Sequence, residues 1–138
     1  MKVIKYLLGI LVFGFVISAT FAGSDPQVTS LAFTETAVAS GGEVFAESCA
    51  RCHGSELEGT ERFPALVGED FEADWAGKTV GDLYTFIHEE MPLGRGGTLT
   101  DEQYHLVTAF VLSHSDIGVS PASAADVSLA FDTPLNFR

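Results

Sequence analysis

The chain has 138 residues, with 19 acidic against 7 basic side chains and a net charge of −12. That length fits one ordinary domain and excludes a large catalytic barrel or a doubly wound fold with a second domain. An acidic chain lacks the lysines and arginines that phosphate contacts need, so we expect no nucleic-acid partner. Two cysteines permit at most one disulfide, which excludes a disulfide scaffold.

The N-terminus has the order of a secretory signal. Two lysines precede an uncharged, largely apolar stretch over residues 6–24, and a small-x-small site ends at Ala22. Residues 1–22 are therefore predicted to be a signal peptide. The alternative is an N-terminal membrane anchor, because 19 uncharged residues approach the ~20 that cross a bilayer; a buried core helix is least favoured. Either main interpretation exports the remainder to the periplasm, soluble or anchored at the inner membrane, assuming a bacterial source.

Removal of residues 1–22 sharpens the acidic character of the chain. That segment holds two lysines and no acid, so the remainder has 19 acids and 5 bases, or a net charge of −14. A surface of this kind favours partners with a basic patch, although charge also serves solubility alone.

The next residues predict a linker and then helices separated by long loops. Residues 23–40 are polar without clear periodicity and indicate a linker. A helix is expected over residues 41–50, and residues 53–78 are expected to form a loop with one short helix around residues 70–75.

Two capping boxes predict the starts of the last two helices. The first box begins at Thr79, and apolar residues follow at helical spacing until Pro92 ends the helix. The second begins at Thr100, and its helix continues to about His114. Residues 116–138 are rich in Ser, Ala and Pro and indicate a C-terminal extension.

The predicted domain, residues 41–115, is all-α with about three to five helices and irregular N- and C-terminal arms. No segment shows convincing strand alternation. About 75 residues supply only a marginal hydrophobic core, so an additional group is expected to help fill it.

The sequence Cys49-Ala50-Arg51-Cys52-His53 is the most informative feature. Cys-x-x-Cys-His is the attachment signature of c-type haem. Two thiols at this spacing lie on one side of a helical turn, where they can add to the two vinyl groups of one porphyrin. The adjacent His53 then supplies an imidazole to the iron.

Three other interpretations of the cysteine pair are weaker. A thioredoxin-type pair needs a preceding strand in a βαβ setting, which this sequence does not offer. A zinc site needs four ligands, and the other histidines are scattered. A structural disulfide or a chance match is the last alternative.

Met91 is the favoured sixth ligand, because the other methionine, Met1, lies in the export segment. Pro92 follows it and ends the helix, so the side chain is expected on a rigid turn. The alternatives are a Met that fills the core, a second His ligand from His88, His105 or His114, and an open site suited to gas binding or peroxide chemistry.

From Gly41 to about Ser113 the chain resembles a class I cytochrome c, more closely the small bacterial type that occurs free or attached to quinoprotein dehydrogenases and oxidases. The residues that carry this resemblance are Gly41, Phe45, Cys49 to Gly54, Pro64 to Gly68, Trp75 to Leu83, Met91-Pro92 and Leu99 to Tyr104. The resembling region covers about half of the chain.

The resemblance implies one covalent haem c, with Cys49, Cys52, His53, Pro64, Trp75 and Met91 as cofactor-binding residues and His53 and Met91 as iron ligands. The first helix would pack on the last, Gly41 and Phe45 meeting Val107, Phe110 and Val111. The Pro64 carbonyl would accept a hydrogen bond from His53, the alternative being a simple turn. Trp75 would lie against the haem or near a propionate, or only pack in the core. Arg95 could approach a propionate, but a solvated loop charge is favoured.

The function expected from these features is one-electron transfer, not enzymatic catalysis. The chain would shuttle electrons in the periplasm between a dehydrogenase and a terminal acceptor. The alternative is a membrane-anchored cytochrome c subunit of a respiratory or quinoprotein dehydrogenase complex, held through residues 6–24.

Overall fold

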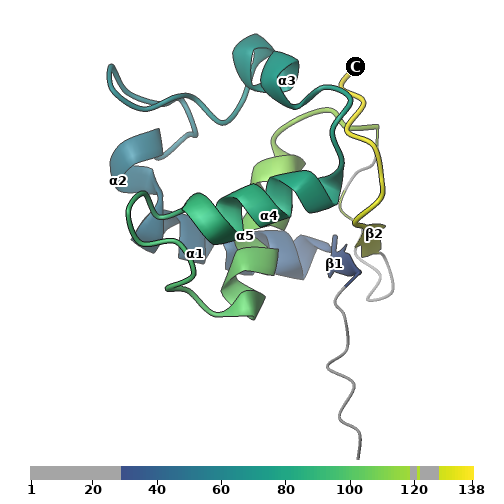
Figure 1. Ribbon diagram of the computed structural model, residues 1–138, viewed down its shortest axis with the longest axis horizontal. Helices are drawn as coiled ribbons and strands as arrows, with labels where there is room; N and C mark the ends of the chain where they lie inside the picture. Colours follow the sequence, from purple (N-terminus) through teal and green to yellow (C-terminus); the bar gives the residue numbers. More distant parts are fainter. Residues whose placement is uncertain (1–28, 119–120, 122–127) are drawn as a thin grey trace, which may run out of the picture.

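The computed structural model describes residues 29–118, 121 and 128–138. These residues form a mostly helical domain, as expected, with a small sheet at one side (Figure 1). The elements in chain order are β1 (Ser30–Ala32), α1 (Glu35–Ser48), α2 (Ala50–His53), α3 (Glu69–Trp75), α4 (Val80–Glu90), α5 (Asp101–Ser113) and β2 (Ser128–Ala130).

Helix α1 begins at Glu35, earlier than the predicted start at Gly41. Thr34 is its N-cap, since the Thr34 side chain accepts a hydrogen bond from the Ala37 amide at 3.1 Å. The predicted linker over residues 23–40 is therefore wrong where it overlaps β1 and α1. Glycine disfavours the helix interior, which is why Gly41 suggested a helix start, but tertiary packing outweighs that preference here.

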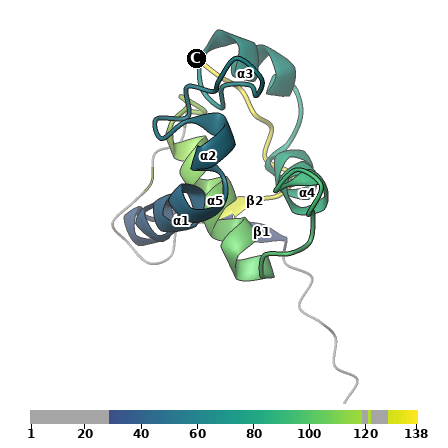
Figure 2. The same ribbon diagram turned by 90° about the vertical axis from the view of Figure 1, so that its left-hand side faces the viewer.

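Helices α1 and α5 pack against each other (Figure 2), and Gly41 lies where their backbones are in close contact. A Cβ atom at this position would collide with the backbone of Leu106 and lie 2.8 Å from the Cβ of Phe110. The rings of Phe45 and Phe110 are 5.2 Å apart, and Val107 is buried beside them. The predicted contact between the first and last helices is confirmed.

Both predicted capping boxes are present. The Thr79 side chain accepts from the Asp82 amide, and the Asp82 carboxylate accepts from the Thr79 amide at 2.8 Å. The hydrogen bonds that the Thr79 amide and hydroxyl donate to the Asp82 carboxylate lower the pKa of Asp82 below its ordinary value. Thr100 and Gln103 form the same pair at α5. The boxes therefore set where α4 and α5 begin.

The C-terminal segment, defined as residues 128–138, is not an irregular arm throughout. Strand β2 pairs with β1 in antiparallel register, Leu129 opposite Leu31, and both leucines are buried. Three-residue strands are too short to show alternation, which explains why sequence patterns miss them.

The C-terminal segment also fixes the connection between α3 and α4. Val80 and Gly81 donate backbone hydrogen bonds to the carbonyls of Thr133 and Phe131, at 3.0 and 2.8 Å. Leu135 donates to the Lys78 carbonyl at 2.8 Å, and its side chain is 1% exposed. The end of the chain thus holds the stretch that joins α3 to α4.

Within the described residues, no helix has both the length and the apolar character needed to cross a membrane. The candidate signal peptide or anchor over residues 1–22 lies outside the residues that the structure describes.

We predict that Leu135→Ala destabilises the holoprotein by about 2–5 kcal/mol, because it leaves a cavity in the core. Asn136→Ala, at an exposed neighbour, is the control and should change stability by less than ~0.5 kcal/mol. Denaturant unfolding of both variants measures the difference. Equal midpoints would show that the C-terminal segment contributes no core packing.

Candidate functional site

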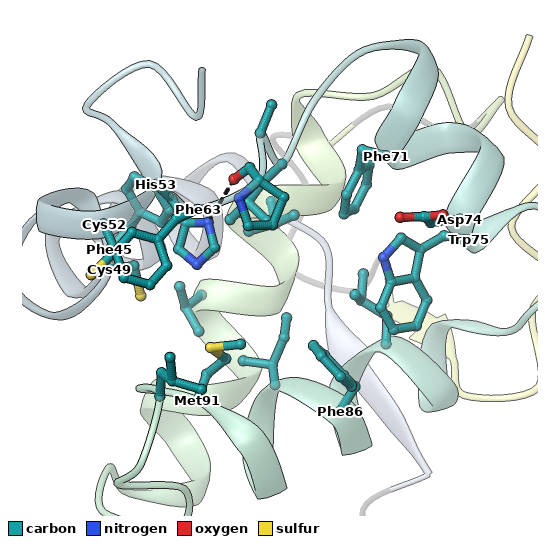
Figure 3. Close-up of a pocket in the computed structure, with 18 of the residues that line it drawn as sticks. Phe45, Cys49, Cys52, His53, Phe63, Phe71, Asp74, Trp75, Phe86 and Met91 are labelled. Atoms are coloured by element: carbon teal, nitrogen blue, oxygen red, sulfur yellow. Dashed lines mark hydrogen bonds between the residues drawn. The ribbon is translucent and has the colours of Figure 1, made fainter. Parts of the chain in front are cut away.

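One large cavity, of about 590 Å³, opens between α2, α3 and α4 (Figure 3). Most of its wall is apolar, with Phe45, Phe71 and Leu83 among the lining residues. A cavity of this size and character suits a bulky, flat, largely apolar ligand.

The predicted haem-attachment residues lie together on this cavity. Cys49, Cys52 and His53 all line it, and both cysteines are free thiols that are partly buried. Burial, and secondarily the neighbouring Cys52, raise the pKa of Cys49 to about 11. That direction is opposite to the lowered pKa of a thioredoxin-type nucleophile, which disfavours a redox-active pair.

His53 is held by a backbone carbonyl. Its Nδ1 lies 2.9 Å from the Pro64 oxygen, and the residue is only 8% exposed. A carbonyl only accepts, so Nδ1 must carry the proton and donate. In the neutral ring, Nε2 is then left with its lone pair free to bind a metal, and the bond to Pro64 increases its basicity.

Met91 comes to the same cavity from the other side. It follows directly after α4 as its C-cap, in an extended conformation with φ −116° and ψ 149°. Figure 3 shows the Met91 side chain and the His53 imidazole reaching into the cavity from opposite sides. Two donors of this kind, imidazole nitrogen and thioether sulfur, suit a six-coordinate haem iron.

The other three histidines do not line the cavity. His88 Nε2 lies 3.3 Å from an Asp101 oxygen, and His105 is stacked on Tyr84 with ring centroids 4.5 Å apart. His114 Nδ1 bonds the Phe110 carbonyl at 2.8 Å. Their positions give no support to a second histidine ligand.

Trp75 forms the end of the cavity far from the cysteines (Figure 3). Its ring packs on Phe86 at 5.5 Å, and Lys78 Nζ lies 4.4 Å above it. Lys78 is the cation among the described lining residues, which also include Asp74. Arg95 is exposed and is not part of the lining.

Several lining residues were not predicted. Phe63 lies 6.4 Å from His53, while Phe86 and Leu93 are 45% and 67% exposed at the cavity. Phe86 and Leu93 flank Met91-Pro92 in the sequence, and this proximity to a predicted ligand is the signal that could have identified them. Soluble surfaces seldom gather exposed apolar side chains without a ligand or a partner.

These observations fit a covalently bound haem. Two thiols one helical turn apart, an imidazole with a free Nε2 and a thioether all meet in one apolar cavity. Within the described residues no cluster of three or more His, Cys, Asp or Glu side chains could hold a metal ion by itself, which disfavours a zinc site.

Comparison with known proteins gives a consistent result. Residues 36–111 match the family model described as cytochrome c oxidase, cbb3-type, subunit III. A thiosulfate dehydrogenase from Stutzerimonas stutzeri is 39% identical over 83 residues, which cover 56% of this chain and 27% of that protein. The cbb3-type cytochrome c oxidase subunit FixP from Sinorhizobium medicae is 36% identical over 102 residues, 65% of this chain and 32% of that protein.

This chain therefore spans about a third or less of the length of these two relatives. Among solved structures, the sulfane dehydrogenase SoxCD from Paracoccus pantotrophus shares 30% sequence identity at a TM-score of 0.48, over 68% of this chain and 48% of that one.

Proposed function

Because the chain belongs to the cytochrome c family described as cytochrome c oxidase, cbb3-type, subunit III, we propose that this electron-transfer domain is a periplasmic one-electron carrier. In this proposal, His53 and Met91 ligate the iron of its haem c. The observation that carries the ligation is the placement of these two side chains on opposite sides of one apolar cavity (Figure 3). The signal peptide over residues 1–22 is part of this proposal. The expected domain bounds of 41 and 115 are too narrow, because β1, the first part of α1 and the C-terminal segment belong to the same fold.

Each residue contributes one property to the carrier. Cys49 and Cys52 hold the haem c by thioether links, which keep the cofactor on an exported protein. His53, which Pro64 orients, would hold the iron through Nε2. Met91 would supply a second ligand, and a thioether in that role would favour the ferrous state. When bound, the haem supplies an iron that alternates between the ferrous and ferric states.

The surroundings of the cavity suit transfer rather than catalysis. The cavity wall is largely apolar, and two ligands from the protein would leave no coordination position for a substrate. We therefore propose an electron-transfer protein that is not itself an enzyme. It would pass electrons between a dehydrogenase and a terminal acceptor.

Helix α3 gives the cavity an acidic edge. Asp70 and Asp74 line the cavity and are exposed, and α3 carries no basic residue. Phe86 and Leu93 add an exposed apolar surface beside it. This combination favours a transient redox partner with a basic patch around an apolar centre.

A second candidate function is a cytochrome subunit of a larger redox complex. The observation that favours it is that the relatives, a thiosulfate dehydrogenase and an oxidase subunit, are proteins of which this chain matches only a part. In that case residues 6–24 would anchor the chain in the membrane.

N-terminal sequencing of the protein purified from its host separates the two candidates. The carrier is expected to begin near Gly23, after cleavage at Ala22. A chain that still begins at Met1 or Lys2 supports the anchored subunit and contradicts the free carrier.

For the ligation, we predict that Met91→Ala abolishes the weak far-red sulfur-to-iron band of the ferric protein and lowers the reduction potential. The pyridine haemochrome spectrum should remain that of a haem with two thioether links, because the cysteines are unchanged. Leu93→Ala, which also alters the cavity lining, is the control and should retain the band. A far-red band that survives Met91→Ala would exclude Met91 as the ligand.

For the acidic edge, we predict opposite salt effects on electron exchange with two small probes. Reduction of the ruthenium hexaammine cation should slow as salt is added, while reduction of the ferricyanide anion should accelerate, each by roughly tenfold between 10 mM and 500 mM salt. Asp70→Asn with Asp74→Asn should weaken both effects.

The control for this experiment is Glu35→Gln with Glu102→Gln, which removes the same charge from sites that do not line the cavity. Equal salt dependence in the two double variants would show that net charge, and not the edge formed by α3, attracts the probe.

A further inference from the structure

We propose that Tyr104 is a positioning residue for the axial methionine: its hydroxyl holds the backbone of Met91 and thereby keeps the thioether on the iron. The inference deepens the proposed function and depends on Met91 being the ligand.

The hydroxyl of Tyr104 reaches from α5 to the end of α4. It donates a hydrogen bond to the Met91 carbonyl at 2.8 Å, and the residue is fully buried. The Leu99 amide in turn donates a hydrogen bond to the Tyr104 hydroxyl oxygen at 3.4 Å. The phenol is therefore engaged both as a donor and as an acceptor at the turn that carries Met91.

Met91 needs this partner because of its place in the helix. Its amide still donates to the Ile87 carbonyl at 3.0 Å, as the last such bond of α4. Carbonyls at a helix end have no amide of their own helix to pair with, and the next residue, Pro92, has no amide hydrogen. The Tyr104 hydroxyl satisfies the Met91 carbonyl instead.

The part of the loop directly after Met91, residues 92–97, is bonded to the end of α4. Gly97 donates to the His88 carbonyl at 2.8 Å, and Arg95 donates to the Pro92 carbonyl at 2.7 Å. A Cβ on Gly96 would collide with the Glu89 backbone, so the loop lies directly on the helix end. These bonds relate the turn to α4, whereas the Tyr104 hydroxyl bonds it to α5.

The bond from Tyr104 fixes the Met91 turn relative to the cysteines and His53, which lie on the opposite side of the cavity. Helix α5 packs on α1 at Gly41, and α1 leads directly into Cys49. A hydrogen bond from α5 to Met91 therefore fixes the methionine relative to the helices that carry the cysteines and His53. Loss of the hydrogen bond between Tyr104 and Met91 should favour conformations in which the thioether has left the iron.

The test uses imidazole as a competing ligand of the ferric holoprotein. A net hydrogen bond of ordinary strength changes an equilibrium by about two- to tenfold, so Tyr104→Phe should bind imidazole more tightly by that factor. The far-red band should remain in the absence of imidazole, because the thioether is still present. The readout is the imidazole concentration that gives half of the shift of the Soret band, which can also be followed in a variant that has no far-red band.

Two control variants separate positioning from general destabilisation. Thr108→Val removes another buried hydroxyl of α5, which donates to the Tyr104 carbonyl at 2.7 Å. It should lower the melting temperature without changing imidazole affinity. Tyr84→Phe makes the same chemical change on α4 and should also leave the affinity unchanged. If Tyr104→Phe yields too little holoprotein, Tyr104→4-aminophenylalanine retains a weaker donor and should give an intermediate affinity.

The outcomes distinguish this inference from the ligation itself. If Met91→Ala binds imidazole much more tightly than the wild type but Tyr104→Phe matches Thr108→Val, Met91 is the ligand and Tyr104 does not position it. If Met91→Ala binds imidazole no more tightly than the wild type, Met91 is not displaced, and the ligation and the inference both fail.

Discussion

The close approach of α1 and α5 at Gly41 determines where both halves of the candidate haem site lie. No side chain can be accommodated there, because a Cβ would occupy the space of the Leu106 backbone. Helix α1 continues into the cysteines and His53, while α5 carries the tyrosine that bonds to the Met91 turn. A shift of one helix against the other would therefore move the two proposed axial ligands relative to each other.

The cavity is a feature that the protein alone does not fill. Apolar side chains from four helices surround about 590 Å³, and Phe86 and Leu93 stay exposed on it. An unfilled cavity of this size removes packing contacts between side chains. In a domain this small, the free energy of those contacts is a large fraction of the net stability, since native proteins are stable by only ~5–15 kcal/mol. The haem c of this family thus belongs to the hydrophobic core as much as to the function.

Much of the fold was predictable because its signals are local. The capping boxes at Thr79 and Thr100 involve residues three positions apart, and the Cys-x-x-Cys-His motif lies within one helical turn. The contact between the first and last helices was predicted from the family resemblance that Gly41 and Phe45 help to carry, and it is present in the structure. The haem-site residues were found through such motifs together with a family resemblance.

What the sequence did not reveal depends on contacts between distant segments. The start of α1 was placed too late because Gly41 disfavours a helix unless another helix packs against it. The strands β1 and β2 are each too short to show a period. The bond from Tyr104 to Met91 has a backbone acceptor, which carries no sequence signature of its own.

The C-terminal segment has a consequence for the order in which the molecule is assembled. Its residues 131–135 bond to residues 77–81, and Phe137 packs on Phe71 of the cavity wall at 6.2 Å. If the chain is exported N-terminus first, as proposed, Cys49 and Cys52 reach the periplasm before these contacts can form. The wall nearest α3 would then lack this support until residues 131–137 follow, and a large flat cofactor would meet a more open cavity in that interval.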